Sequence, residues 1–282
     1  MDVSAGYPAI FRGYIQRSAQ AALETLHSAG PRLPAEQREQ SLYTLEFALN
    51  LPEAWPAARE LLINLGPRLD RAGLREEAAL FLQRGLEQCQ AAGDLAGQAE
   101  IEAQLGGIML AAGRMEEART LYSASAGRFA ALGDRHSQAR ALNDWAYLDV
   151  LQQRSESAAQ LAAQAMSLAG PDDRETTFGQ FVLGCLAMER RDWTAALELF
   201  QQALAGWQRH DDPVMIARSL SNLGMAQRGA GQHAAAADSF HQAIALMEAL
   251  GDRVNQALVR LNLGNLCWAQ GQPQQALALF LQ

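Results

Sequence analysis

Apolar residues recur at helical spacing along most of the chain, and the pattern repeats in blocks of about 40 residues. Each block contains two apolar stretches of helical length, separated by one short turn and followed by another. Alanine and leucine dominate these stretches, and both residues lose little conformational freedom in a helix. The pattern therefore predicts a series of antiparallel helix pairs.

The period is clearest at a small residue inside the first helix of each block. The small residues are Gly66, Gly106, Ala146, Gly184, Gly224 and Gly264, so the steps are 40, 40, 38, 40 and 40 residues. Twelve residues after each comes an alanine: Ala78, Ala118, Ala158, Ala196, Ala236 and Ala276. An aromatic residue recurs in the second helix at Tyr122, Phe200, Phe240 and Phe280. Small residues at the first two positions let the paired helices approach closely, and one pair cannot bury its apolar face without stacking on others.

Two kinds of turn separate the helices. The turn inside a block has glycine at Gly73, Gly113, Gly231 and Gly271, where a left-handed backbone ends the first helix. This glycine is missing around Gln153 and Arg191, so we expect those two hairpins to turn differently. The turns between blocks lie at 92–94, 132–134, 169–172 and 250–252, and each contains an Asp that can cap the next helix.

The repeated pattern L-G-x6-G-x4-A-x3-F/Y, best seen in Leu223-Gly224, Gly231, Ala236 and Phe240, resembles the tetratricopeptide repeat. The usual period is about 34 residues, and the longer period here is similar to an extended subclass. That subclass occurs in sensor arms of bacterial STAND-type regulators and in Pins-like scaffolds. The resemblance covers residues 57–282 and implies an all-α fold, a right-handed α-solenoid of stacked antiparallel helix pairs.

We expect two regions: residues 1–56, an N-terminal helical cap or degenerate repeat, and residues 57–282, six repeats with the last truncated. In the first region a helix from Tyr7 to Ala29 stops at Gly30-Pro31, and a second helix runs from Pro34 to the break at Leu51-Pro52. A linker remnant of a preceding domain is the alternative. The sequence ends inside an apolar helix at 278–282, which predicts either a fragment of a longer chain or self-association through this open end.

Composition and charge exclude several classes of function. The net charge of −8, with arginines spread along the chain, argues against nucleic-acid binding. All 23 basic residues are arginine, which removes P-loop, Schiff-base and Ser–Lys chemistry. The residues 1–6 lack the features of a signal peptide, and no stretch is long enough to cross a membrane. We therefore expect a cytoplasmic protein with no membrane contact.

Neither the cysteines nor the histidines form a pattern that indicates chemistry. Cys89, Cys185 and Cys267 are far apart and make no CxxC pair, so neither a zinc site nor a disulfide is predicted. The histidines at 27, 136, 210, 233 and 241 show no metal-binding spacing, and G-x-S-x-G is missing. We expect no enzyme activity, no cofactor and no metal.

The resemblance implies that the first helices line a concave groove that holds a partner. One position on successive first helices carries Asn64, Gln104, Asp144, Val182, Asn222 and Asn262. Asparagine is unusual inside a helix, and in a groove its amide can hydrogen-bond an extended peptide. The alternative is that this polar ladder only satisfies neighbouring helices.

Neighbouring groove positions carry Arg140, Asn143, Tyr147, Arg218, Ser221, Met225, Asn265 and Trp268. Arg140 and Arg218 can hold a carboxylate with two hydrogen bonds, while Tyr147 and Trp268 can bury an apolar side chain of a partner. The arrangement partly resembles the carboxylate clamp of chaperone-binding arrays. The clamp's lysines are absent, however, which argues against a chaperone C-terminus as the ligand.

The predicted function is a protein- or peptide-binding scaffold, part of a larger bacterial signalling or regulatory protein. The alternative is a small-molecule or short-peptide sensor domain of a transcriptional or STAND-type regulator. A deep closed pocket would favour the sensor, and a long open groove would favour the scaffold.

Overall fold

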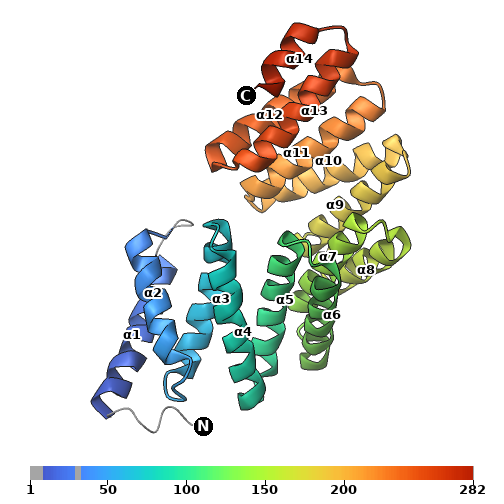
Figure 1. The fold of residues 1–282 in the computed structure, drawn as a ribbon. Coiled ribbons are helices and arrows are strands. Elements are labelled where there is room, and N and C mark those ends of the chain that lie inside the picture. The colour runs from blue at the N-terminus through green and yellow to red at the C-terminus, as the bar shows by residue number, and fades with distance from the viewer. Residues whose placement is uncertain (1–8, 29–32, 282) are drawn as a thin grey trace. The chain divides into compact units, whose positions relative to one another are not determined.

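The computed structural model describes residues 9–28 and 33–281, and in these residues the regular structure is entirely helical (Figure 1). The helices are α1 (Ala9–Ser28), α2 (Ala35–Ala48), α3 (Trp55–Arg71), α4 (Arg75–Ala92), α5 (Leu95–Ala111), α6 (Met115–Leu132), α7 (Arg135–Leu151), α8 (Ser155–Leu168), α9 (Arg174–Glu189), α10 (Trp193–Arg209), α11 (Pro213–Gly229), α12 (His233–Leu250), α13 (Arg253–Ala269) and α14 (Pro273–Phe280). The predicted all-α solenoid of stacked helix pairs is confirmed.

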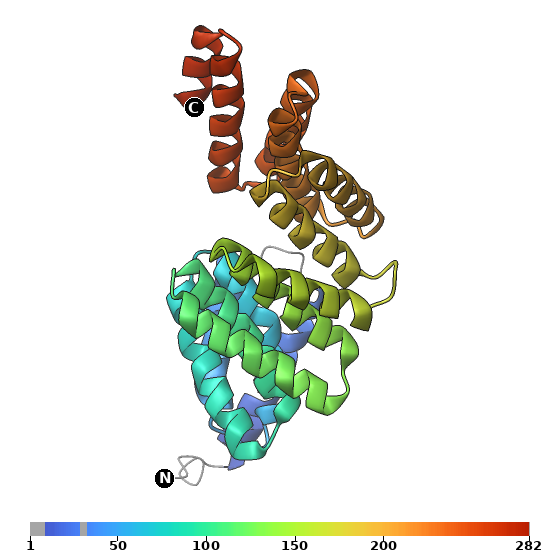
Figure 2. The same ribbon diagram turned by 90° about the vertical axis from the view of Figure 1, so that its right-hand side faces the viewer.

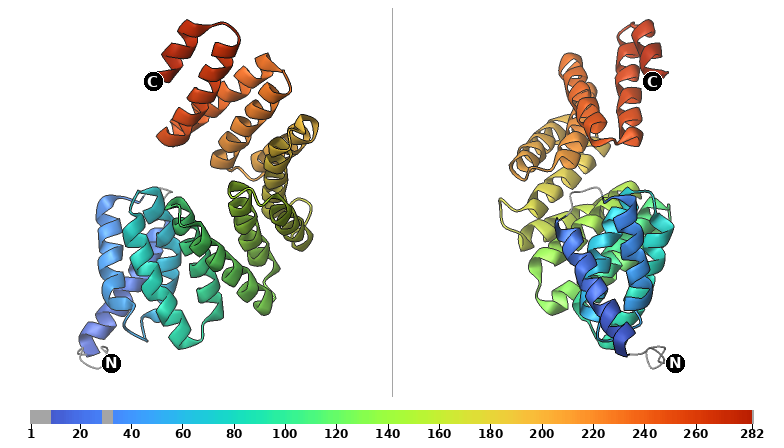
Figure 3. Two further views of the ribbon diagram at one scale, coloured as in Figure 1. Left: turned by 45° about the vertical axis from the view of Figure 1, so that its right-hand side comes forward. Right: turned by 90° about the vertical axis from the view of Figure 1, so that its left-hand side faces the viewer.

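The chain divides into two compact units, Met1–Asp144 and Trp145–Gln282, and the division falls inside α7. In the first unit, α3 with α4 and α5 with α6 form successive hairpins, drawn from cyan to green in Figure 2. In the second, α9 with α10, α11 with α12 and α13 with α14 do the same, as the two views of Figure 3 show. Each predicted repeat therefore corresponds to one helical hairpin.

The region before the first repeat is a helical hairpin of its own. Helix α1 packs against both α2 and α3, and its buried Ile15 and Leu26 belong to the same core as Leu45 of α2 and Leu61 of α3. Of the helix predicted from Tyr7 to Ala29, residues 7, 8 and 29 lie outside the described residues, as do Gly30 and Pro31. We interpret this hairpin as a cap on the first repeat, because it shares that repeat's apolar core.

Most hairpins close by placing an aromatic ring of the second helix on a glycine of the first. A β-carbon added to Gly106 would lie 2.7 Å from the ring of Tyr122, and one added to Gly224 would lie 2.7 Å from the ring of Phe240. Gly184 with Phe200 and Gly264 with Phe280 repeat the contact. The block around Ala146 has alanine at 162, the position of the ring elsewhere, so small residues there occupy both positions.

The expectation that two hairpins turn differently is wrong. Gln153 and Arg191 adopt the left-handed backbone, with φ of 57° and 58°, as the turn glycines do. The amide of Arg154 donates to the carbonyl of Asp149 at 2.8 Å, which is the bond that the amide of Gln232 makes to Gln227 at 2.8 Å. Bulky residues thus accept the left-handed conformation because the same helix-ending hydrogen bonds hold the chain there.

The shortened block differs at its outer turn instead. Helix α8 has 14 residues, against 18 in α4, α6 and α12. It ends at Ala169 in extended backbone, where those three helices end on a left-handed glycine. Asp173, and not the predicted Asp172, then caps α9 by accepting from the Glu175 amide at 2.8 Å. The two missing residues of the period are therefore lost at the end of α8.

The other predicted caps are present. Asp94, Asp134 and Asp252 accept hydrogen bonds from the amides three residues later, at 2.9, 3.1 and 3.1 Å. Each bond satisfies one of the free N–H groups at the start of a helix. Asp212 caps α11 in the same way, accepting from the Met215 amide at 3.0 Å. Successive first helices thus begin at a carboxylate.

We expect alanine substitutions at two helical glycines to change stability in opposite directions. Gly224→Ala places a methyl group against the Phe240 ring and should cost about 1–3 kcal/mol. Gly127 in α6 has no atom within 4 Å of its added β-carbon, so Gly127→Ala should stabilise by about 0.5–1 kcal/mol. Shifts in the urea unfolding midpoint measure both effects. Equal shifts would show that helix propensity, and not the ring contact, governs Gly224.

Stability should fall in acid through the capping carboxylates. Burial opposes ionisation of Asp94, but the Gly97 amide and the Arg59 guanidinium outweigh it and lower the pKa of this carboxyl. A lowered folded-state pKa gives stability that is present above about pH 4, the unfolded pKa, and is lost as pH falls through the folded value.

Asp94→Asn keeps a capping oxygen but loses the charge, so it should lower the melting temperature at pH 7. The difference from the unchanged chain should shrink as pH falls below about 4, measured by thermal melts followed by circular dichroism. A difference that is independent of pH would contradict a role for the carboxylate charge.

Candidate binding groove

A pocket of about 280 Å³ lies in the second unit, on the first helices of its hairpins. Six residues predicted for the groove line it: Tyr147, Arg218, Ser221, Asn222, Met225 and Asn262. Six further lining residues were not predicted: Phe181, Met247, Asn255, Leu258, Val259 and Leu261. A signal for two of these was available, because Phe181 and Leu261 lie 40 residues before and after Ser221 and so share its place in the repeat.

Arg218 of α11 is the charged residue of this lining, and aromatic side chains hold it in place. Its Nη2 donates to the Tyr147 hydroxyl at 2.8 Å. The guanidinium carbon lies 5.1 Å from the centre of the Tyr147 ring and 5.8 Å from that of Phe181, both within range of cation–π attraction. In the described part of the chain, Arg218 has no ion pair with a carboxylate, and the side chain is only partly exposed.

Three asparagines around Arg218 have different degrees of freedom. Asn255 is held by Asp252, to which its side-chain amide donates at 2.6 Å. Asn222 makes only a long contact, 3.7 Å, from its amide to the Cys185 sulfur of the preceding first helix. Asn262 has no side-chain hydrogen bond among the residues that the structure describes. Asn222 and Asn262 therefore keep most of their hydrogen-bonding capacity for another molecule.

In the first unit, the predicted groove residues already have internal partners. Arg140 forms an ion pair with Glu100, which precedes it by 40 residues on the previous first helix. Gln104 donates to the Ile63 carbonyl at 2.9 Å, and Asn64 donates to the Glu60 carbonyl at 2.8 Å. The alternative reading of the polar ladder, that it satisfies helices of the array itself, thus describes these three residues.

Three other predictions need correction or remain open. Asn143 is 1% exposed, so its side chain packs inside the first unit and does not face a groove. Trp268 is 66% exposed and Asn265 is exposed, and neither lines the pocket. Asp144 is half-buried. A contact of these last three with a partner stays a prediction.

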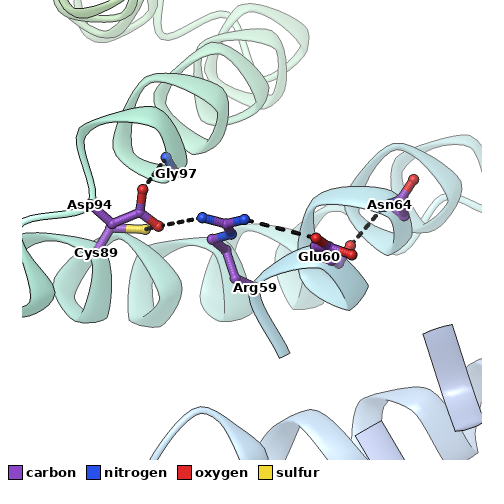
Figure 4. A network of polar contacts seen from close by, with 6 residues as sticks. All are labelled: Arg59, Glu60, Asn64, Cys89, Asp94 and Gly97. Atoms are coloured by element: carbon purple, nitrogen blue, oxygen red, sulfur yellow. Dashed lines mark hydrogen bonds and ion pairs between the residues drawn. The ribbon is translucent and has the colours of Figure 1, made fainter. Parts of the chain in front are cut away.

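A polar network in the first unit ties successive repeats together (Figure 4). Arg59 of α3 donates to Asp94 at 2.9 Å, and Asp94 in turn caps α5 through the Gly97 amide. The Cys89 sulfur lies 3.9 Å from the same carboxylate. Burial and then the Asp94 charge raise the pKa of the Cys89 thiol to about 12, so this cysteine stays protonated near neutral pH. The network is a structural link between α3 and α5.

The remaining chemistry of the described residues is sparse. Burial raises the pKa of the Cys185 thiol to about 12, although nearby Arg218 opposes the shift. Within residues 9–28 and 33–281 no cluster of three His, Cys, Asp or Glu side chains is placed to hold a metal ion. Among the same residues, no helix has the length and apolar character needed to span a bilayer.

Comparison with known proteins agrees with this architecture. Residues 181–249 and 215–282 each match the family model described as tetratricopeptide repeat. Over 113 residues, 39% of this chain, the sequence is 34% identical to the regulatory protein AfsR of Streptomyces coelicolor. The match spans 11% of the length of AfsR.

Two solved structures share the fold at low sequence identity. A Rap protein in complex with Competence and Sporulation Factor superposes with a TM-score of 0.67 and 12% identity, covering 96% of this chain and 75% of that one. A tetratricopeptide repeat protein from Parabacteroides merdae gives a TM-score of 0.63 and 15% identity, covering 94% and 91%. The chain is therefore a tetratricopeptide repeat protein, with the family's repeats matched over residues 181–282.

Proposed function

We propose that this chain is a scaffold that binds a protein or an extended peptide in the pocket of its second unit, as part of a larger bacterial regulatory protein. The observation that carries the proposal is the group of unsatisfied polar side chains in that pocket, next to exposed apolar ones. Arg218 and Asn262 lack internal partners of matching chemistry, and Leu258 and Leu261 are 54% and 47% exposed. Such mixed surfaces suit peptides, which present both amides and side chains.

Two of the comparisons support this context. The Rap structure holds Competence and Sporulation Factor, and AfsR is described as a regulatory protein. The shared fold makes a binding role plausible for this chain, while its partner has to follow from its own residues.

A second candidate is a sensor for a small molecule or short peptide in a transcriptional or STAND-type regulator. The size of the pocket favours it, since about 280 Å³ is close to the lower end of small-molecule sites, about 300 Å³. Native mass spectrometry of the purified chain distinguishes the two candidates. A bound small molecule of defined mass would favour the sensor.

We expect Asn222→Ala/Asn262→Ala to lose a partner that the unchanged chain captures from a lysate of the source organism. The substitution removes two amides from the pocket, while Asn265→Ala removes an exposed amide of α13 outside it and should capture normally. Quantitative mass spectrometry of the captured proteins gives the measurement, with helicity checked by circular dichroism. Identical sets of proteins from all three chains would contradict binding in this pocket.

A further inference from the structure

We propose that Arg218 is the receptor for a single carboxylate of a bound peptide, whose backbone amides are held by Asn222 and Asn262. This inference rests on the proposed function and specifies the chemistry of the same pocket. It follows from four features of the second unit: the register of charges along the repeat, the setting of the guanidinium, the charge of the lining and the spacing of the asparagines.

The register of the repeat explains why Arg218 has no internal counterion. Its equivalents on the other first helices are Glu60, Glu100, Arg140, Phe178 and Leu258. Arg140 follows a glutamate by one period and pairs with it. Arg218 instead stands one period after Phe178 and one before Leu258, so neither stacked neighbour carries a charge. The positive charge is left for a molecule outside the array.

The setting of the guanidinium prepares it for an anion. The Tyr147 hydroxyl accepts one N–H bond, and the Met215 sulfur, 3.8 Å from Nη1, is a weak acceptor. Arginine has five N–H donors, so a pair remains for the two oxygens of a carboxylate. The Tyr147 and Phe181 rings restrict the side chain, which lowers the entropy lost when the anion binds.

The lining favours one negative charge over a phosphate. Arg218 is its one charged residue, and the rest are neutral amides, a serine hydroxyl, aromatic rings and aliphatic side chains. A phosphate carries nearly two negative charges near neutral pH and would be only half neutralised. A carboxylate is matched by a single arginine.

The asparagines favour a peptide as the carrier of this carboxylate. Asn222 and Asn262 occupy the same repeat position on α11 and α13, so they recur along the groove as peptide units recur along an extended chain. Each offers a donor and an acceptor, which is what a backbone amide requires. Leu258 and Leu261 add exposed apolar surface for a neighbouring side chain of the peptide.

The test uses two synthetic libraries of short, N-acetylated random peptides, one with free C-terminal carboxylates and one with C-terminal amides. Each is incubated with the full chain, and captured peptides are identified by mass spectrometry. Enrichment only from the free-acid library assigns the C-terminal carboxylate. Enrichment of Asp or Glu at a fixed position in both libraries assigns a side-chain carboxylate. Either result supports the proposal.

Affinities of the enriched peptides, measured by fluorescence anisotropy, test the role of Arg218 directly. Arg218→Gln should weaken binding about 10- to 100-fold, the loss expected for charge-assisted hydrogen bonds. Arg218→Lys should weaken it less, and Arg228→Gln, on the same helix outside the pocket, should leave it unchanged. Replacing the peptide carboxylate by an amide should cause the same loss with the unchanged chain and no further loss with Arg218→Gln.

Two outcomes would overturn the inference, and they differ in what they leave standing. Enriched peptides without a shared carboxylate, bound equally by Arg218→Gln, would refute the receptor and retain the proposed peptide-binding function. No enrichment from either library would refute both. The amide analogue of the peptide keeps the test valid even if Arg218→Gln is poorly folded, because it leaves the protein unchanged.

Discussion

In each hairpin that has it, the aromatic ring on glycine sets how closely the two helices pack. The ring of Phe240 occupies the space that a side chain at position 224 would fill, and the same is true of Phe200 at Gly184. A larger residue in place of the glycine would push the helices apart and change the surface offered to the next hairpin. Because each hairpin of a solenoid packs only on its neighbours, this local distance governs how successive first helices line up. The pocket depends on that alignment.

Features determined by nearby residues could be predicted from the sequence, and those determined by the folded hairpin could not. The glycine turns and most aspartate caps depend on residues three or four positions away, so a pattern of that length indicates them. Gln153 and Arg191 were misjudged because no local preference favours their left-handed backbone. The hydrogen bonds that end the preceding helix impose it, and these form only when the second helix packs back on the first.

The candidate groove shows the same division. The period identified the first-helix positions, and several of them converge on one pocket in the second unit. The same period did not tell which side chains were already satisfied. Arg140 and Arg218 share a repeat position, but Arg140 has Glu100 one period before it, whereas Arg218 has Phe178. Asn143 is buried because the neighbouring helices cover it, which a single helix does not indicate.

The hydrogen bond from Arg218 to Tyr147 has a mechanical consequence. Tyr147 lies on α7 and Arg218 on α11, so the bond passes over the intervening first helix α9. An array in which each pair touches only the next behaves as a spring whose coils tilt independently. A tie between next-nearest coils couples three of them, so this stretch of the second unit resists bending more than a stretch held by adjacent contacts alone. The most polar part of the pocket thus sits on the stiffest segment of the spring.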